Sequence, residues 1–185
     1  EYLTYKMSNF FQIMQPKIAE AFQKKFDAAA ILNVENPYPQ SLEESVTTTS
    51  QIVSGDISYD NILAVEDLVT DADHDPNAFI STRKNRSLLR QARKVEGGVV
   101  TESLYDRGAN TLDGLPVADL HDLEKGNLYV GDFDYMYYGV PFGMSYKISE
   151  EAQLSTLTNA DGTPVNLYEQ ELVALRATVD VAFME

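Results

Sequence analysis

Two carboxylates and three tyrosines lie close together in the sequence, and their types suit several kinds of chemistry. Asp132 and Asp134 are two residues apart, and in the aromatic-rich strand predicted here they would face the same side. Paired carboxylates can do acid–base work, although they more often rim a sheet in solvent. Tyr135, Tyr137 and Tyr138 could stack on a sugar or a base, whereas packing in a core or an interface is the natural use of tyrosine. One alternative is therefore an acidic hydrolase or a carbohydrate-binding domain.

Three aspartates at alternate positions resemble the beginning of a calcium-binding loop: Asp71, Asp73 and Asp75. The match then fails, because Pro76 stands where the loop needs a glycine for its sharp turn. Thr82 likewise stands where the loop needs its bidentate glutamate. An acidic turn that ends a helix explains these residues better, so we predict no metal site.

Six of the fourteen basic residues fall within twelve positions, residues 83–94. They are Arg83, Lys84, Arg86, Arg90, Arg93 and Lys94. A phosphate-binding helix is one interpretation, but no aromatic residues interleave and the rest of the chain is acidic. The segment could also be a solvated helix face, or it could contact an acidic face on a neighbouring copy of the chain. The last interpretation makes Arg83, Lys84, Arg86 and Arg90 candidate subunit-interface residues, together with Tyr135, Tyr137 and Tyr138.

The composition excludes several classes of protein. The 185 residues include no cysteine and only two histidines, which excludes disulfide scaffolds, thiolate metal sites and cysteine nucleophiles. No phosphate-binding loop or dinucleotide fingerprint is present, and the apolar runs are far shorter than the roughly 20 residues of a membrane span. A net charge of −15 disfavours binding to nucleic acid and to anionic membranes. We predict no catalytic, cofactor-binding or metal-binding residues, and a structural or interaction protein rather than an enzyme.

The first half of the chain is predicted to hold one short strand and two helices. The strand covers residues 2–7, and the first helix covers about 16–27, with Pro16 at its first position. The Thr- and Ser-rich run 45–53 is predicted to be extended. Ser58 is predicted to cap a second helix, which carries a clean apolar side and ends near Asp71.

The second half is predicted to be richer in strands. A basic helix, capped by Ser81 or Thr82, runs to about Ala92, and Gly97 and Gly98 end that unit. Residues 99–113 are predicted to be a loop, and a turn is predicted at Asn159, Asp161 and Gly162. The strands are predicted at 78–81, 115–118, 127–138, 144–148 and, last, within 169–181. Since strands and helices do not alternate regularly, the fold class is α+β. Because a strand pattern runs into each end, at Glu1 and Glu185, we expect a piece of a longer protein.

Several short motifs follow one another along the chain in a particular order. The helix near the N-terminus has Ile18 and Ala19 followed by Ala21 and Phe22, with Asp27 after them. The segments that carry the remaining motifs are 78–90, Leu115-Pro116-Val117 with Gly114 just before it, Gly131-Asp132-Phe133, and 171–183 with Arg176. In this order the segments resemble the major capsid protein family of tailed bacteriophages, which has the Hong Kong 97-type fold.

The resemblance implies an axial lobe, residues 41–142, and part of a peripheral lobe with a helix and a long sheet, residues 1–40 and 143–185. It implies that the chain lacks the family's N-terminal arm and extended loop. It also implies self-assembly into hexamers and pentamers of an icosahedral virion shell around double-stranded DNA, in the bacterial host cytoplasm. Scaffolding, portal and maturation protease proteins are further partners that the family implies, whereas sequence-specific nucleic acid binding and membrane attachment are not implied.

Overall fold

The structure is a computed structural model, and it describes residues 2–96, 98–160 and 162–184. Four residues lie outside the described ranges, and earlier predictions fall on them. They are Glu1 and Glu185, into which a strand was predicted to run, Gly97 of the predicted Gly97-Gly98 break, and Asp161 of the predicted turn. The backbone forms two compact units. The first unit is Glu1–Gln23 with Gly139–Ala182, and the second unit is Lys24–Tyr138 with Phe183–Glu185. The predicted lobes divide elsewhere, at 40/41 and 142/143, and their assignment stays a prediction.

The helix α1 (Tyr2–Leu32) contradicts the predicted strand over 2–7 and the predicted helix start at Pro16. Pro16 lies inside α1, on its exposed side. The less exposed side chains recur at helical spacing from Phe11 through Ile18 and Phe22 to Phe26, so one stripe continues past the proline. The periodic burial of this stripe outweighs the β-propensity of the tyrosines and threonine near the start.

Two short helices open the second unit after α1. The helix α2 (Leu42–Thr49) contradicts the prediction that 45–53 is extended. Ser41 caps it by accepting a hydrogen bond from the Glu44 backbone N–H, and Glu43 and Glu44 occupy its first turn, where acidic side chains favour a helix. The helix α3 (Tyr59–Asp71) confirms the predicted helix, with Ser58 as its cap.

A five-stranded sheet forms the centre of the second unit, in the order β4-β5-β6-β1-β7. Its strands are β1 (Ala78–Ser81), β4 (Tyr105–Asp106), β5 (Thr111–Leu112), β6 (Leu115–Asp119) and β7 (Tyr129–Gly131). The central strand β1 runs parallel to β6 and antiparallel to β7. One core cluster packs Ile62 of α3 and Leu89 against Phe79, Leu112 and Val117 of the sheet. A second cluster gathers around Ile80, Leu120 and Leu123.

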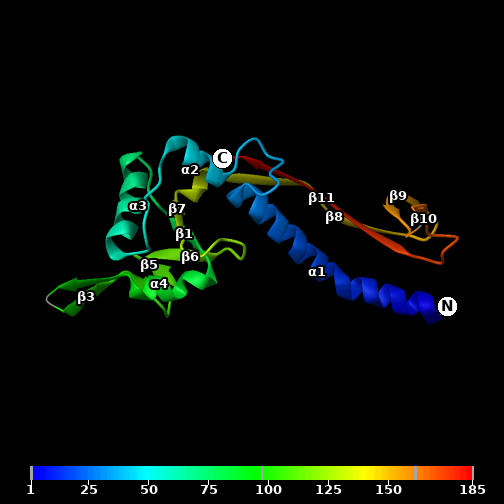
Figure 1. Cartoon of the computed structure of the whole chain (residues 1–185), viewed down its shortest axis with the longest axis horizontal. Helices are drawn as coiled ribbons and strands as arrows, with labels where there is room; N and C mark the ends of the chain where they lie inside the picture. The colour runs from blue at the N-terminus through cyan, green and yellow to red at the C-terminus, as the bar shows by residue number, and fades with distance from the viewer. Residues whose placement is uncertain (1, 97, 161, 185) are drawn as a thin grey trace. The chain divides into compact units, whose positions relative to one another are not determined.

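The connection from β1 to β6 contains more structure than predicted. It holds the 3-10 helix η1 (Arg83–Asn85), the helix α4 (Arg86–Gln91) and the antiparallel pair β2 (Arg93–Glu96) and β3 (Val99–Ser103). The predicted loop over 99–113 is therefore wrong, since it contains β3, β4 and β5. Backbone pairing satisfies the peptide groups of this segment, although it has little regular alternation to predict the strands. Figure 1 shows α4 next to β5 of the sheet, while the hairpin that contains β3 projects away from the sheet.

The strand predicted over 127–138 is interrupted, whereas the gap between it and the strand predicted over 144–148 is absent. The 3-10 helix η2 (Phe133–Tyr135) bends the chain, and then β8 (Tyr137–Ser149) continues through Gly139, Pro141 and Gly143. It pairs with β11 (Ala174–Met184) in a two-stranded sheet. Because β8 pairs with only one strand, it has an open edge, and proline is tolerated in such edge strands even though it has no backbone N–H to donate.

The first unit contains the first part of α1, most of β8 and β11, and the hairpin of β9 (Gln153–Thr158) and β10 (Pro164–Asn166). The Asn159 backbone N–H donates to the Thr163 carbonyl, and the Gly162 N–H donates to the Asn159 carbonyl, which confirms the turn at its described residues. The Tyr146 hydroxyl of β8 donates to the Gln15 carbonyl of α1, at 3.3 Å. No helix among the described residues is long and apolar enough to cross a membrane.

Candidate subunit interface

The basic segment begins directly after the central strand β1, but neither predicted capping hydroxyl caps it. Thr82 precedes η1 and makes no side-chain cap bond, and Ser81 still belongs to β1. The Ser81 hydroxyl instead accepts a hydrogen bond from the Asn85 amide, at 3.3 Å. The segment is therefore positioned by a buried side-chain contact and by the sheet, and not by a cap.

Asn85 is fully buried and fixes the loop that precedes β7. Its Nδ2 donates to the Asn127 carbonyl at 2.6 Å, and its Oδ1 accepts from the Gly126 backbone N–H at 2.8 Å. Gly126 has a φ of 103°, a left-handed conformation that favours glycine. Sequence analysis did not single out Asn85, because its two partners in this loop are more than 40 residues away.

The four predicted basic interface residues divide into two pairs. Arg83 and Arg86 both form ion pairs with Asp119, with Nε–Oδ2 and Nη2–Oδ2 distances of 3.3 and 2.9 Å. Lys84 and Arg90 are exposed and have no carboxylate partner within the described ranges. Arg83 and Arg86 thus have a role within their own chain, whereas Lys84 and Arg90 present their charge to the outside.

The three tyrosines do not form one platform. Tyr135, in η2, packs its ring edge-on against His74, with ring centroids 5.0 Å apart. Tyr138 lies beside Phe26, with a centroid distance of 6.2 Å. Tyr137 and Tyr138 are consecutive residues of β8, so their side chains point to opposite faces. Even so, Tyr135, Tyr137 and Tyr138 leave 59%, 59% and 72% of their surface exposed.

The two predicted carboxylates have local structural roles. Asp132 caps η2, because its Oδ1 accepts from the Asp134 backbone N–H and from the Asn77 side-chain amide. The prediction that both carboxylates face the same side of one strand is therefore wrong, since the chain turns between them. In the same way, Asp71 ends α3 and Asp73 follows in a left-handed conformation, as the helix-ending interpretation predicts. The described residues contain no cluster of three or more potential metal ligands.

A carboxyl pair between α3 and the β5–β6 turn was also not foreseen. Burial, the nearby charge of Asp113 and a hydrogen bond with it, and the charge of Asp67 raise the pKa of Glu66 to about 7. The Oε1 atom of Glu66 is buried and has no partner within the described part of the chain. An ordinary glutamate has a pKa of 4.5, so folding makes Glu66 bind a proton more tightly.

We expect this pair to make stability fall as the pH rises. The pKa of Glu66 is higher in the folded chain than in the unfolded chain. The protonated carboxyl therefore stabilises the folded chain at low pH, and this stabilisation is lost as the pH rises from about 4.5 to about 7. Glu66→Gln should remove most of this slope and stabilise the chain at pH 8 by roughly 1 kcal/mol, a figure reduced for solvent screening. Urea unfolding between pH 5 and 8 measures the effect, with the exposed Asp71→Asn of the same helix as control. An unchanged slope in Glu66→Gln would contradict the assignment.

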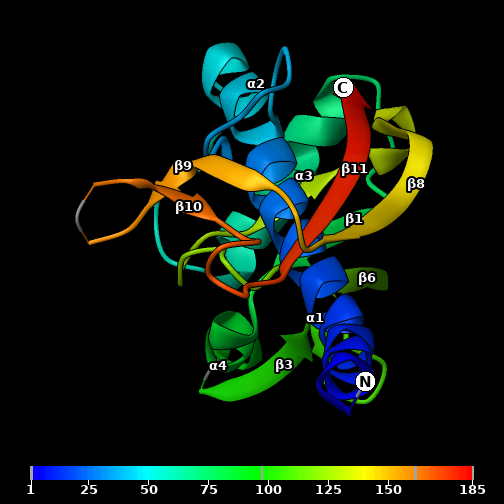
Figure 2. The ribbon, with the colours of Figure 1, turned by 90° about the vertical axis from the view of Figure 1, so that its right-hand side faces the viewer.

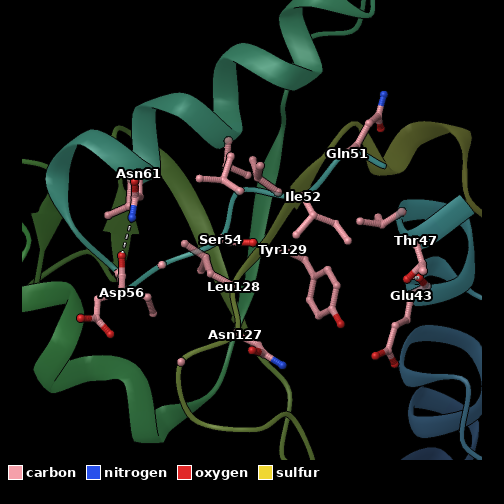
Figure 3. Close-up of a pocket in the computed structure, with 18 residues that line it drawn as sticks. Glu43, Thr47, Gln51, Ile52, Ser54, Asp56, Asn61, Asn127, Leu128 and Tyr129 are labelled. Carbon is pink, nitrogen blue, oxygen red and sulfur yellow. Dashed lines mark hydrogen bonds between the residues drawn. The ribbon is translucent and has the colours of Figure 1, made fainter. Parts of the chain in front are cut away.

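A pocket of about 430 Å³ lies between α2, residues 51–57, α3 and β7. Among the described residues, Glu43 and Asp56 are its only charged lining residues, and apolar side chains such as Ile52, Val65 and Leu128 form part of its wall. Figure 3 shows the Tyr129 ring directed toward Glu43. Burial and the Glu43 charge raise the pKa of Tyr129 to about 12, so its hydroxyl stays a neutral donor. Sequence reasoning missed the pocket, since two helices and a strand must meet to form it.

Comparison with solved structures identifies the class of fold. A structure from Microbacterium phage Oxtober96 matches with a TM-score of 0.73 and 21% identity, covering 94% of this chain and 59% of that chain. A structure from Mycobacterium phage Adephagia matches with a TM-score of 0.68 and 22% identity, covering 88% of this chain and 54% of the other. The fold is that of phage major capsid proteins, the Hong Kong 97-type, as the α+β prediction and the resemblance anticipated.

Comparison of sequences gives the family. The model of the phage capsid family matches residues 1–184, so this chain belongs to the phage capsid family. The "Major capsid protein" of Staphylococcus phage 80alpha is 51% identical over 98% of this chain and 56% of its own length. A "Probable major capsid protein gp17" of Mycobacterium phage D29 is 26% identical over 95% of this chain and 59% of its own length. The chain thus spans somewhat more than half of these relatives, and nothing supports the hydrolase or carbohydrate-binding alternative.

Proposed function

We propose that this chain is part of a phage or prophage major capsid protein that self-assembles into a virion shell. Copies of it would form the hexamers and pentamers of an icosahedral shell around double-stranded DNA. One observation carries the proposal: over 98% of the chain, 51% of residues are identical to a major capsid protein. Its work would be geometric and electrostatic rather than catalytic, and its acidic surface would let packaged DNA be released again.

The proposal includes the organisation and the setting of the subunit. Residues 41–142 would form the axial lobe, and residues 1–40 and 143–185 would form part of the peripheral lobe. Assembly would take place in the bacterial host cytoplasm, with scaffolding, portal and maturation protease proteins as further partners. Neither sequence-specific nucleic acid binding nor membrane attachment belongs to this function.

Electron microscopy and sedimentation of the full-length gene product test the proposed function. Shells, or rings of five and six subunits, are the expected result when any scaffolding protein is co-expressed. A particle that stays monomeric at high concentration and in several salt conditions would contradict the proposal.

Within such an assembly, the exposed cations of the η1–α4 segment are the best-placed contacts. Lys84 and Arg90 are exposed and lack an ion-pair partner among the described residues, so a neighbouring carboxylate can reach them at low cost. Tyr135, Tyr137 and Tyr138 add exposed aromatic area, which interfaces commonly bury. Arg83 and Arg86 would contribute mainly by holding the segment against Asp119.

We expect Arg90→Glu to weaken assembly without unfolding the chain. Reversing one charge at a subunit contact should raise the concentration needed for assembly by about tenfold, because each contact recurs around the ring. Arg107→Glu is a matched control, since Arg107 is also exposed and lies in the turn between β4 and β5. Sedimentation velocity of the full-length variants gives the assembled fraction, and thermal melting reports the fold. Equal assembly by the two variants would remove α4 from the interface.

A further inference from the structure

Within residues 27–94 of the second unit, acidic and basic side chains are divided between two consecutive segments. Residues 27–82 contain eleven acidic and no Lys or Arg side chains, whereas residues 83–94 contain six basic and no acidic side chains. The acidic part forms the end of α1, then α2, α3 and β1, and the basic part forms η1, α4 and the start of β2. A subunit with this division attracts another copy when the acidic part of one meets the basic part of the next.

One element of the acidic part, α2, lies at the opposite end of the second unit from α4 of the basic part. Figure 1 and Figure 2 both place α2 at the upper end of the unit and α4 at its lower end, with the sheet between them. Two different surfaces on opposite sides of a subunit are what a head-to-tail contact needs, and such a contact forms a ring when the rotation closes. The division of charge is therefore suited to a ring of identical copies.

The pocket described above lies beside α2, at this end of the second unit. Glu43 lines this pocket, is half-buried, and forms no ion pair with any residue that the structure describes. The Tyr129 hydroxyl points the same way (Figure 3), and apolar side chains such as Ile52 and Leu128 line the wall behind. A partly apolar pocket whose described lining holds two carboxylates, Glu43 and Asp56, and no basic residue favours a cation on an aliphatic stem.

Lysine and arginine side chains fit this description, because their aliphatic stems can pack on a hydrophobic surface while the charged end pairs with a carboxylate. The opposite end of the unit supplies such side chains in Lys84 and Arg90, which are exposed and without a carboxylate partner among the described residues. Arg83 and Arg86 are already bound to Asp119 and are less available.

We propose that the pocket between α2 and α3 of one copy receives Lys84 of η1 or Arg90 of α4 from the next copy. Glu43 would form the ion pair, and the apolar part of the pocket wall would cover the side-chain stem. The inference rests on the proposed self-assembly and adds to it the surface that α4 contacts.

Charge reversal in the full-length protein tests the inference, with a control one residue away. Glu43→Lys should raise the concentration needed for assembly by about tenfold, because it places like charges together at every contact. Glu44→Lys makes the same change in charge on an exposed neighbour outside the pocket lining, and it should assemble almost normally. Glu43→Gln, which keeps the side-chain shape, replaces Glu43→Lys if thermal melting shows that the lysine variant does not fold.

The decisive arm restores the pair with its charges exchanged. Glu43→Lys combined with Lys84→Glu and Arg90→Glu should recover most of the assembly that either change alone removes. Failure of this recovery, or an equal defect in Glu44→Lys, would overturn the pocket as the receiving surface. Normal assembly of Glu43→Lys would overturn it too, while leaving the proposed function intact. Only a wild-type protein that never assembles would contradict the proposed function itself.

Discussion

Phe79→Ala should destabilise the second unit by about 4 kcal/mol, the cost of deleting a large buried side chain from a packed core. Phe79 has no exposed surface and lies at the middle of β1, between β6 and β7. It packs in one cluster with Ile62 of α3 and with Leu89 of α4. A cavity at this place separates both helices from the sheet, and neighbours on paired strands cannot collapse to fill it.

Urea unfolding and calorimetry of the chain measure the loss. Phe142→Ala removes the same ring from β8, where 71% of the residue is exposed, and should change stability by less than about 0.5 kcal/mol. Because the chain forms two compact units, calorimetry should show that the unfolding temperature falls for the second unit, which contains Phe79. A loss below about 1 kcal/mol in Phe79→Ala would contradict the central place of this residue in the core.

Asn85→Ala should cost about 3 kcal/mol, because it leaves buried polar groups without partners. The Gly126 N–H would lose its acceptor, and the Asn127 carbonyl would lose its donor. Both groups belong to the loop that leads into β7, so the loop should become mobile before the unit unfolds.

Hydrogen exchange distinguishes this effect from a general loss of stability. The Gly126 amide should exchange faster in Asn85→Ala under conditions in which the sheet amides stay protected. Ser87→Ala, at an exposed position on α4, is the control and should leave the Gly126 amide unchanged. Asn85→Asp should cost more than Asn85→Ala, since it keeps the acceptor for Gly126 but places a carboxylate against the Asn127 carbonyl. Unaltered exchange of Gly126 in Asn85→Ala would contradict the proposed role of this side chain.

Local signals predicted some elements and failed for others. Ser58 and the apolar side of α3 gave that helix, because the cap and the periodicity agree. In α2 they disagree, since its threonines favour a strand while Ser41 and two first-turn glutamates favour a helix. In the structure the cap and the helix dipole outweigh the weak preference of the threonines. The same competition explains α1, where a long stripe of partly buried side chains decides against the predicted strand.

The basic segment, residues 83–94, was identified from the sequence, but the ion pairs of two of its arginines with Asp119 were not. Asp119 reaches Arg83 and Arg86 because β1 and β6 run parallel, with Ser81 opposite Asp119. That register places the end of β6 beside the first residues of η1, and no local pattern encodes it. The pocket beside Glu43 depends in the same way on where β7 joins the sheet. Sequence thus predicted which residues are charged, and the sheet decides which of them remain available.

The position of β1 in its sheet also has a consequence for the order of folding. This four-residue strand pairs with residues near 117 and near 130, so each partner lies roughly forty to fifty positions further along the chain. Loop-closure entropy must be overcome before either pairing forms, whereas α2 and α3 need only near neighbours. We therefore expect the helices to form early and the sheet to be completed in the slow step of refolding. A nascent chain on the ribosome would keep β1 unpaired until β6 and β7 have emerged.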